Sequence, residues 1–302
     1  MSAEGVTRSG FVALAGRPNV GKSTLVNRMV GEHVVAVSDK PQTTRRRQLG
    51  VVTRGDAQLV LVDLPGFQRP FDRLTERMQR SVDEALEGVD AAVLLLDATS
   101  RIGPGDRHIA ARLLRPGALQ CLIVLNKVDR LAPAKIAQAI EAAAALATEL
   151  GGEYTALHPV SALTGDGVEG LVDDLAALLP GGPAYFPEGV VSDQTPEQRI
   201  AELVREAALG LIREEVPHAV AVVVDEIEKA KSIRVVRCTV VCETQSQKRI
   251  LVGKGGSMIR EIGTRSRPGV ERVLGGRVHL ELTVRVRRHW RRDEAELDRL
   301  GV

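Results

Sequence analysis

A segment near the amino terminus has the residue types and the spacing of a loop that binds phosphate groups. It follows the apolar residues 11–15 and precedes residues 24–29, which have the pattern of a helix. In this context Gly16 and Gly21 allow backbone N–H groups to face phosphates at a helix N-terminus, and Lys22 reaches the outer phosphates. The hydroxyl of Ser23 is suited to magnesium. The residues assigned to the loop are Gly16, Arg17, Pro18, Asn19, Val20, Gly21, Lys22, Ser23 and Thr24. The loop predicts that the chain binds a nucleoside triphosphate.

A second motif, further along the chain, indicates which base is bound. It follows the apolar residues 122–125 and consists of Asn126, Lys127, Val128 and Asp129. The carboxylate of Asp129 can accept both the N1–H and the N2 amino group of guanine, whereas adenine has no such pair of donors. Lys127 would lie along the base, and Asn126 would join this loop to the phosphate loop. A backbone N–H for the guanine oxygen is expected from the segment Ser161, Ala162 and Leu163. The predicted ligands are therefore GTP and GDP.

Two further segments are expected to hold magnesium and to sense the third phosphate. An Asp-x-x-Gly motif ends the apolar residues 58–62 and consists of Asp63, Leu64, Pro65 and Gly66. The Asp63 carboxylate can hold magnesium through water, and the N–H of Gly66 can contact the third phosphate. Residues 41–45 are polar and break the strand pattern, as a first switch should, although an exposed basic loop around residues 45–47 fits the same stretch. Resemblance to related GTPases with a Thr-Thr-Arg switch selects Thr44 rather than Thr43 as a magnesium ligand. The expected ligands are Ser23, Thr44 and Asp63.

The position after Gly66 departs from Ras-like GTPases, in which a glutamine orients the attacking water. Phe67 stands there and is counted among the residues around the nucleotide, but an aromatic ring cannot position water by hydrogen bonding, and Gln68 is one residue late. Asn19 occupies the place at which a subgroup of GTPases with a hydrophobic residue at the glutamine position holds a monovalent cation. We hypothesise that potassium supplies charge stabilisation there. The residues expected to act in hydrolysis are Lys22, Thr44, Gly66 and Asn19.

The composition is that of a globular protein without a membrane span. The 302 residues are 44% hydrophobic, no apolar run is long enough to cross a bilayer, and residues 1–10 contain no apolar signal core. We therefore expect a cytoplasmic protein. Cys121, Cys238 and Cys242 lack the paired spacing of a metal site and are expected to be buried, reduced thiols. The six histidines are scattered, which argues against zinc.

The net charge of +2 conceals an asymmetry along the chain. Residues 229–292 contain 17 Lys/Arg and 4 Asp/Glu, whereas residues 1–228 contain 23 Lys/Arg and 31 Asp/Glu. A basic module of this kind usually meets nucleic acid or an anionic membrane surface.

The order of apolar and amphipathic segments predicts the architecture. Strand-like residues 11–15, 60–62, 91–96, 119–125 and 155–160 alternate with helical residues 75–86, 135–150 and 168–178. This alternation predicts an α/β domain with a mostly parallel sheet, in which nucleotide lies at the carboxyl ends of the strands. We place this P-loop GTPase domain at residues 1–180, a linker at 181–195 and a smaller α+β domain at 196–302.

The second domain has the pattern of a type II KH domain. The expected order is helix 195–215, strands 219–228 and 233–244, helix 246–252, a Gly-Lys-Gly-Gly loop, helix 257–263 and strand 277–286. In KH domains a Gly-x-x-Gly loop clamps the nucleic-acid backbone. Aromatic residues form only 2% of the chain, so recognition by base stacking is not expected. Trp290 is expected to pack rather than to bind RNA. The candidate RNA-binding residues are Lys248, Arg249, Gly253, Lys254, Gly255, Gly256 and Arg260.

Taken in order, these motifs resemble those of the Era family of bacterial GTPases over essentially the whole chain. Further matching segments are residues 42–45, 214–218 and 246–248. The resemblance implies an assembly factor that binds 16S ribosomal RNA near its 3′ end, acts in rRNA processing and 30S subunit assembly, and exposes its RNA-binding surface according to nucleotide state. It also implies a monomer, and peripheral association with the inner face of the cell membrane as an additional location.

Two other interpretations stay open. In one, the protein is a nucleotide-gated RNA-binding module in which hydrolysis has no physiological part, as Phe67 allows. In the other, it is a membrane-surface GTPase that couples growth or the cell cycle to GTP level, for which a basic patch would suffice. The Gly-x-x-Gly loop distinguishes them, since a lipid-binding patch needs charge but not that loop.

Overall fold

The computed structural model describes residues 5–38, 40, 43–66, 72–117, 119–212, 219–230 and 233–301 of the chain. The chain forms two compact units, each held together by its own internal contacts. One comprises residues 1–35, 44–69 and 78–193, and the other comprises residues 36–43, 70–77 and 194–302. The domain limits at residues 180 and 196, with a linker between them, stay a prediction.

The first unit is built on a six-stranded sheet in the order β2-β3-β1-β4-β5-β6. Its strands are β1 (Arg8–Ala15), β2 (Gln48–Arg54), β3 (Ala57–Asp63), β4 (Ala91–Asp97), β5 (Gln120–Asn126) and β6 (Ala156–Pro159). The edge strand β2 runs antiparallel to β3, and the other pairs are parallel. The expected mostly parallel sheet is confirmed, while β2 is a strand that the pattern did not predict.

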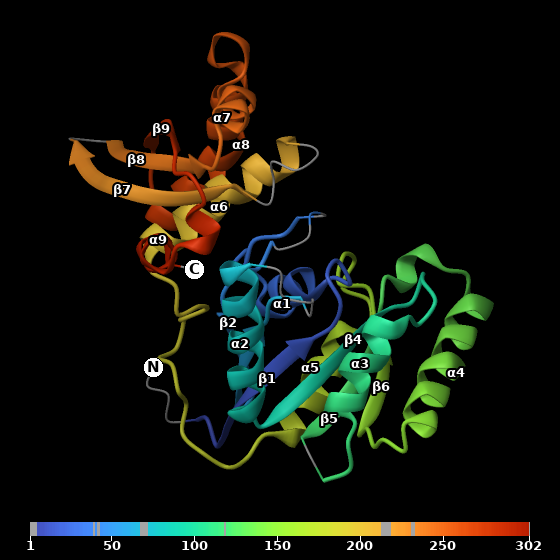
Figure 1. The fold of residues 1–302 in the computed structure, drawn as a ribbon. Coiled ribbons are helices and arrows are strands. Elements are labelled where there is room, and N and C mark those ends of the chain that lie inside the picture. Colours follow the sequence, from blue (N-terminus) through green and yellow to red (C-terminus); the bar gives the residue numbers. More distant parts are fainter. Residues whose placement is uncertain are drawn as a thin grey trace. The chain divides into compact units, whose positions relative to one another are not determined.

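Helices cover both faces of this sheet (Figure 1). One face packs against α1 (Lys22–Val30) and α5 (Val168–Leu178), and the other against α2 (Arg73–Glu87), α3 (Pro104–Leu113) and α4 (Pro133–Glu149). Because both faces are covered, the central strands are apolar along almost their whole length. The loops after β1, β3, β4 and β5 follow the carboxyl ends of parallel strands, so they meet at one edge of the sheet.

The predicted linker residues up to 193 lie along the first unit. Ser9 Oγ donates to the carbonyl of Pro183 at 2.6 Å, and the side-chain amide of Gln58 both donates to and accepts from the backbone of Phe186 at 2.9 Å. The Val51 N–H donates to the Val191 carbonyl at 2.9 Å. This segment therefore adds backbone contacts to the edge strand β2.

The second unit has a three-stranded sheet in the order β7-β8-β9. Its elements are α6 (Pro196–Leu211), β7 (Ala221–Ala230), β8 (Ile233–Cys242), α7 (Gln245–Val252), α8 (Ser257–Leu274), β9 (Val278–Val286) and α9 (Glu294–Leu300). Strand β8 pairs with β7 in the antiparallel direction and with β9 in the parallel direction. The core contains Ile200 and Val204 of α6, Cys238 of β8, and Ile262 and Val270 of α8. The predicted order of helices and strands is confirmed.

Further observations bear on the predictions. The expected helix 257–263 is only the first part of α8, which continues through Pro268 to Leu274. Trp290 is fully buried and donates from Nε1 to the carbonyl of Ala219 at 3.1 Å, so it packs as predicted. The three cysteines are free and buried, also as predicted. Among the described residues, none of the helices is both long and apolar enough to span a membrane.

Candidate nucleotide-binding and RNA-binding sites

The phosphate loop joins β1 to α1 and needs glycine at two positions. A Cβ atom at Gly16 would lie 2.5 Å from the carbonyl oxygen of Leu95. Gly21 has a φ of 104°, and a Cβ atom there would lie 2.2 Å from the side-chain nitrogen of Asn126. Asn19 has a left-handed φ of 63°, which asparagine tolerates better than most residues. The loop therefore has the close backbone packing that a phosphate cradle requires.

Lys22 is buried inside this loop. Its Nζ atom donates to the carbonyls of Gly16 and Arg17, each at 3.1 Å. Burial lowers the pKa of Lys22 from 10.5 to about 8, although the nearby charge of Asp63 raises it in part. A desolvated ammonium group whose hydrogen bonds in the described structure go to neutral carbonyls is well suited to an anionic ligand.

Ser23, Thr44 and Asp63 meet beside Lys22, as the sequence predicts. The Oδ2 atom of Asp63 accepts hydrogen bonds from Ser23 Oγ at 2.7 Å and from Thr44 Oγ1 at 3.2 Å, and the two hydroxyls are 3.1 Å apart. Thr43 donates instead to the carbonyl of Lys40 at 2.7 Å. Thr44 rather than Thr43 therefore lies beside Asp63, and its role as a magnesium ligand stays a prediction.

One oxygen atom of the Asp63 carboxylate is available to bind a cation. It is fully buried, and its Oδ1 atom has no hydrogen-bond partner among the described residues. Burial raises the pKa of Asp63, while Lys22 and the hydroxyls of Ser23 and Thr44 act against that rise. An unpaired carboxylate oxygen beside two hydroxyl oxygens is a donor set that magnesium prefers. The residues fit a magnesium ion.

Asn126 joins three of the predicted motifs. Its Nδ2 donates to the carbonyl of Val20 at 2.8 Å, and its Oδ1 accepts from the N–H of Ala162 at 2.9 Å. The Ser161 N–H donates to the carbonyl of Asp166 at 2.9 Å, so the donation of an N–H from this segment to guanine stays a prediction. Asp129 lies in a short 3-10 turn and is exposed, as a residue that meets the base should be.

Other predicted residues are placed less directly. The side chains of Val20 and Leu64 are buried in the core, so only their backbone could face a nucleotide. Gly66 lies against the phosphate loop, because a Cβ atom there would be 2.9 Å from Cγ of Pro18. Phe67 lies outside the described residues.

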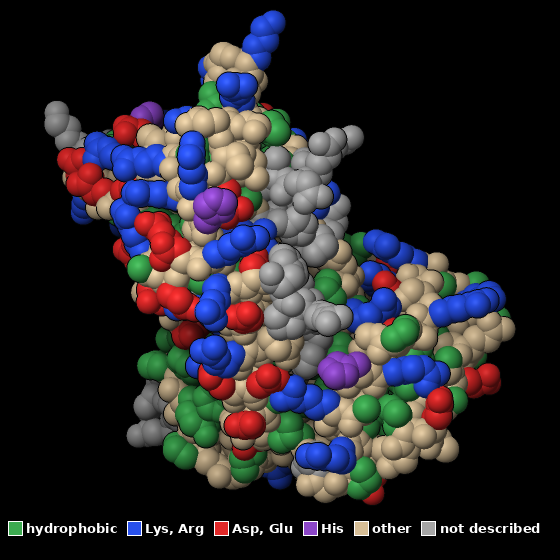
Figure 2. Space-filling view, in the orientation of Figure 1, with side chains coloured by type: hydrophobic (Ala, Val, Ile, Leu, Met, Phe, Trp, Pro, Cys, Tyr) green, Lys and Arg blue, Asp and Glu red, His purple; other side chains and the backbone are tan. Residues whose placement is uncertain are grey.

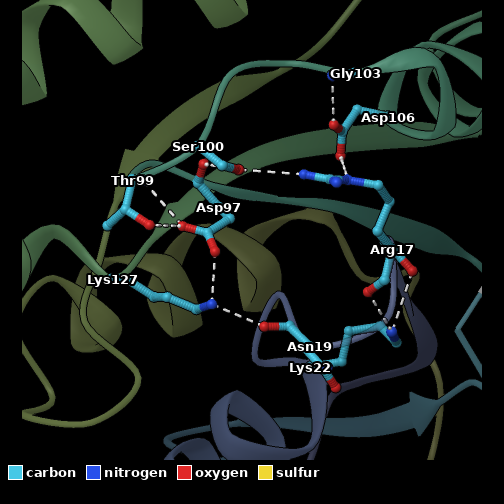
Figure 3. A network of polar contacts seen from close by, with 10 residues as sticks. Arg17, Asn19, Lys22, Asp97, Thr99, Ser100, Gly103, Asp106 and Lys127 are labelled. Atoms are coloured by element: carbon cyan, nitrogen blue, oxygen red, sulfur yellow. Dashed lines mark hydrogen bonds and ion pairs between the residues drawn. The ribbon is translucent and has the colours of Figure 1, made fainter. Parts of the chain in front are cut away.

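Two acidic residues that sequence reasoning missed contact the site. Asp97, at the end of β4, pairs with Lys127 at 2.6 Å, and Asp106, in the first turn of α3, pairs with Arg17 at 2.7 Å (Figure 3). The position of Asp97 at the carboxyl end of a parallel strand is a signal that could have identified it. Asp106 has no comparable signal in the sequence.

The Gly-Lys-Gly-Gly loop lies between α7 and α8. Gly253, Gly255 and Gly256 have φ values of 72°, 58° and 79°, and a Cβ atom at Gly253 would lie 2.7 Å from the backbone nitrogen of Met258. Lys254 and Gly255 are exposed. Lys and Arg side chains protrude at the tip of this unit, near α7 (Figure 2). The candidate residues Arg249 and Arg260 are exposed, and Lys248 is partly buried. The exposed backbone of Gly255 and the positive charge of Lys254 are features that attract phosphate groups.

The fold and the two sites together define a P-loop GTPase joined to a KH domain. A family model described as 50S ribosome-binding GTPase matches residues 11–127, and a KH-domain model matches residues 215–291. GTPase Era of a Nocardioides species is 45% identical over 97% of this chain and 96% of its own length. GTPase Era of Mycobacterium tuberculosis H37Rv is 43% identical over 97% and 98%. The chain therefore belongs to the Era family of GTPases and is a GTP-hydrolysing enzyme.

Two solved structures have the same fold over nearly the whole chain. One is Era in complex with MgGDPNP and nucleotides 1506–1542 of 16S ribosomal RNA, with a TM-score of 0.92, 35% identity, and coverage of 98% of this chain and 99% of that chain. The other is a point variant of Aquifex aeolicus Era bound to GDP and aluminium fluoride, with the same TM-score and identity and coverage of 97% and 99%. These structures support the predicted cofactors, guanine nucleotide and magnesium.

Proposed function

We propose that this protein is a GTP-controlled RNA-binding protein that acts in processing of 16S ribosomal RNA and in assembly of the 30S subunit. The KH domain binds single-stranded rRNA near its 3′ end, and GTP hydrolysis ends the interaction. The observation that carries the proposal is the left-handed glycine loop over residues 253–256, in which Lys254 and Gly255 are exposed, with its basic neighbours. The Era structure that contains nucleotides 1506–1542 of 16S rRNA supports the choice of RNA.

The nucleotide site supplies the parts of the hydrolytic mechanism. Ser23, Thr44 and Asp63 would hold magnesium, which would neutralise charge on the phosphates. Lys22 and the N–H of Gly66 stabilise the charge on the transferred phosphoryl group, as the contact of Gly66 with the phosphate loop allows. Hydrolysis in this arrangement depends on positioning and charge rather than on a side-chain base.

Asn19 is proposed to hold potassium beside the phosphates. This proposal is supported by the position of Asn19 inside the phosphate loop and by its left-handed backbone conformation. Replacing sodium by potassium should raise turnover in the wild type and have no effect in Asn19→Ala. Equal turnover of the wild type in the two salts would contradict a role for potassium and would leave the RNA-binding proposal unaffected.

The RNA-binding proposal is tested with a labelled oligonucleotide that matches the 3′ end of 16S rRNA. Binding is measured with GDP and with a non-hydrolysable GTP analogue over a salt titration, because phosphate contacts make affinity salt-dependent. Gly255→Asp should weaken binding and leave basal hydrolysis intact. Gly275→Asp is the matched control, since Gly275 also has a left-handed φ, 66°, and a Cβ atom there would also meet open space.

The outcomes separate the proposed function from its alternatives. Tight, sequence-dependent binding with the GTP analogue alone supports nucleotide-gated assembly. Equal affinity of Gly255→Asp and the wild type would show that the KH loop is not the RNA site. Weak binding that ignores sequence and nucleotide would favour a membrane-surface GTPase, which sedimentation with anionic vesicles would then test. We propose a cytoplasmic monomer, which the mass in solution would check.

A further inference from the structure

The segment from Asp97 to Asp106 contacts both nucleotide-binding loops, although none of the recognised motifs includes it. It connects β4 to the first turn of α3 (Figure 3). Ala98 donates its N–H to the carbonyl of Asn126 at 3.0 Å, which ties the segment to the guanine loop by its backbone. Two carboxylates then extend the contact to the phosphate loop.

Asp97 acts on the middle of the phosphate loop through Lys127. The Nζ atom of Lys127 donates to Asp97 Oδ2 at 2.6 Å and to the carbonyl of Asn19 at 2.8 Å. Thr99 orients the carboxylate, because its N–H and its hydroxyl donate to Oδ1 at 2.9 and 2.6 Å. Burial acts to raise the pKa of Asp97, but the hydrogen bonds from Lys127 and Thr99 outweigh burial and keep that pKa below its usual value. The carboxylate is thus charged where it meets Lys127.

Asp106 acts on the start of the same loop. Its Oδ1 accepts from Nε of Arg17 at 2.7 Å, and its Oδ2 accepts from the N–H of Gly103 at 2.8 Å. Asp106 is 2% exposed, so the pair is shielded from water on one side. Ser100 Oγ accepts a further bond from Arg17 at 3.2 Å. A Cβ atom at Gly105 would lie 3.0 Å from Cδ of Arg17, so the helix start also fits closely around the arginine stem.

We propose that Asp97 and Asp106 are positioning residues that hold the first half of the phosphate loop in its binding conformation. Asp106 fixes Arg17, whose carbonyl accepts from Lys22, and Asp97 fixes Lys127, which holds the carbonyl of Asn19. A loop that is ordered before binding loses less conformational entropy when nucleotide arrives. The proposal concerns nucleotide binding only and does not depend on the RNA partner.

The test compares variants that remove the charge but keep the local cap. In Asp106→Asn the side-chain oxygen can still accept from the Gly103 N–H, whereas its amide cannot pair with Arg17. Dissociation of a fluorescent GDP analogue, chased with excess GDP, should be about tenfold faster, within the range measured for contacting charged residues. Asp97→Asn should also dissociate faster. Glu149→Gln is the matched control, because it removes only an exposed ion pair between Arg107 of α3 and Glu149, whose N···O distance is 2.8 Å.

A double-mutant cycle and a stability measurement exclude a purely structural role. Arg17→Met should match Asp106→Asn, and the double variant should dissociate no faster than either single one, because the residues act as one unit. The melting temperature in saturating GDP should fall more than the melting temperature without nucleotide. Additive effects, equal falls in the two melting temperatures, or wild-type dissociation from a folded Asp106→Asn would overturn the proposal.

Discussion

Proton uptake by Lys22 should accompany nucleotide binding. Its ammonium group is buried, donates to two neutral carbonyls, and has a pKa lowered from 10.5 to about 8 by burial. Phosphate groups favour the charged form, so the pKa of Lys22 rises when nucleotide binds. Above pH 8 the free protein has mostly lost this proton, and the complex must regain it. Affinity should therefore fall as pH rises through the lower pKa.

The size of the effect follows from that pKa. At pH 8.5 a group with a pKa of about 8 is roughly one-quarter protonated, so binding should take up about 0.75 proton. Between pH 7 and 8.5 the same group should weaken binding about fourfold. An unshifted lysine would take up almost no proton and would leave the affinity constant. The buried thiols do not interfere, since burial raises the pKa of Cys121 and Cys238 to about 12.

Calorimetry measures this uptake directly. GDP is titrated into the nucleotide-free protein with a magnesium chelator, in two buffers that differ in ionisation enthalpy, at pH 7 and 8.5. Asp63→Asn provides an internal comparison, because loss of the Asp63 charge should lower the pKa of Lys22 further and increase proton uptake at pH 7. Proton uptake near zero at pH 8.5, together with an unchanged affinity, would refute the assignment of a lowered pKa to Lys22.

Three further results are expected. Asp129→Asn should shift preference from GDP towards XDP by at least about a hundredfold in competition, because an amide can donate where xanthine offers an oxygen; retained preference for GDP would contradict the guanine assignment. Gly66→Ala should lower the free energy of unfolding by about 1–3 kcal/mol in a denaturant titration, because its Cβ would lie 2.9 Å from Cγ of Pro18, and unchanged stability would mean that this contact is loose. Cys121 and Cys238 should resist thiol reagents until the protein unfolds, since burial raises the pKa of both thiols, and rapid labelling of the native protein would contradict their burial.

The nucleotide motifs could be predicted because each has a fixed local spacing. Residues at the ends of parallel strands meet at one edge of the sheet, so the sequence predicts that Lys22, Asp63 and Asn126 are neighbours. The bond from Asn126 to Val20 has the geometry that this reasoning requires. The choice of Thr44 rather than Thr43 as a magnesium ligand needed the resemblance to other GTPases, because residue type alone cannot distinguish two adjacent threonines.

The elements that were missed lack a strong local pattern. Strand β2 pairs with β3 along its whole length and begins directly after a polar, arginine-rich stretch. Helix α3 begins with Pro104 and contains charged residues on its exposed side, so it resembles a loop in sequence. Helix α8 continues past Pro268, and Gly269 there lies close against Leu203 of α6; such a contact between distant residues has no local signal.

The nucleotide site contains buried polar groups that phosphate and magnesium could satisfy. Lys22 is charged and buried beside neutral carbonyls, and Asp63 has a buried oxygen without a hydrogen bond among the described residues. Both features cost stability, because a buried charge and a buried oxygen without a hydrogen bond are each unfavourable. Magnesium and phosphate would satisfy them together, so part of the binding free energy comes from relief of a cost already present in the folded protein. It follows that nucleotide should stabilise the first unit strongly, as any ligand does that binds only the folded state.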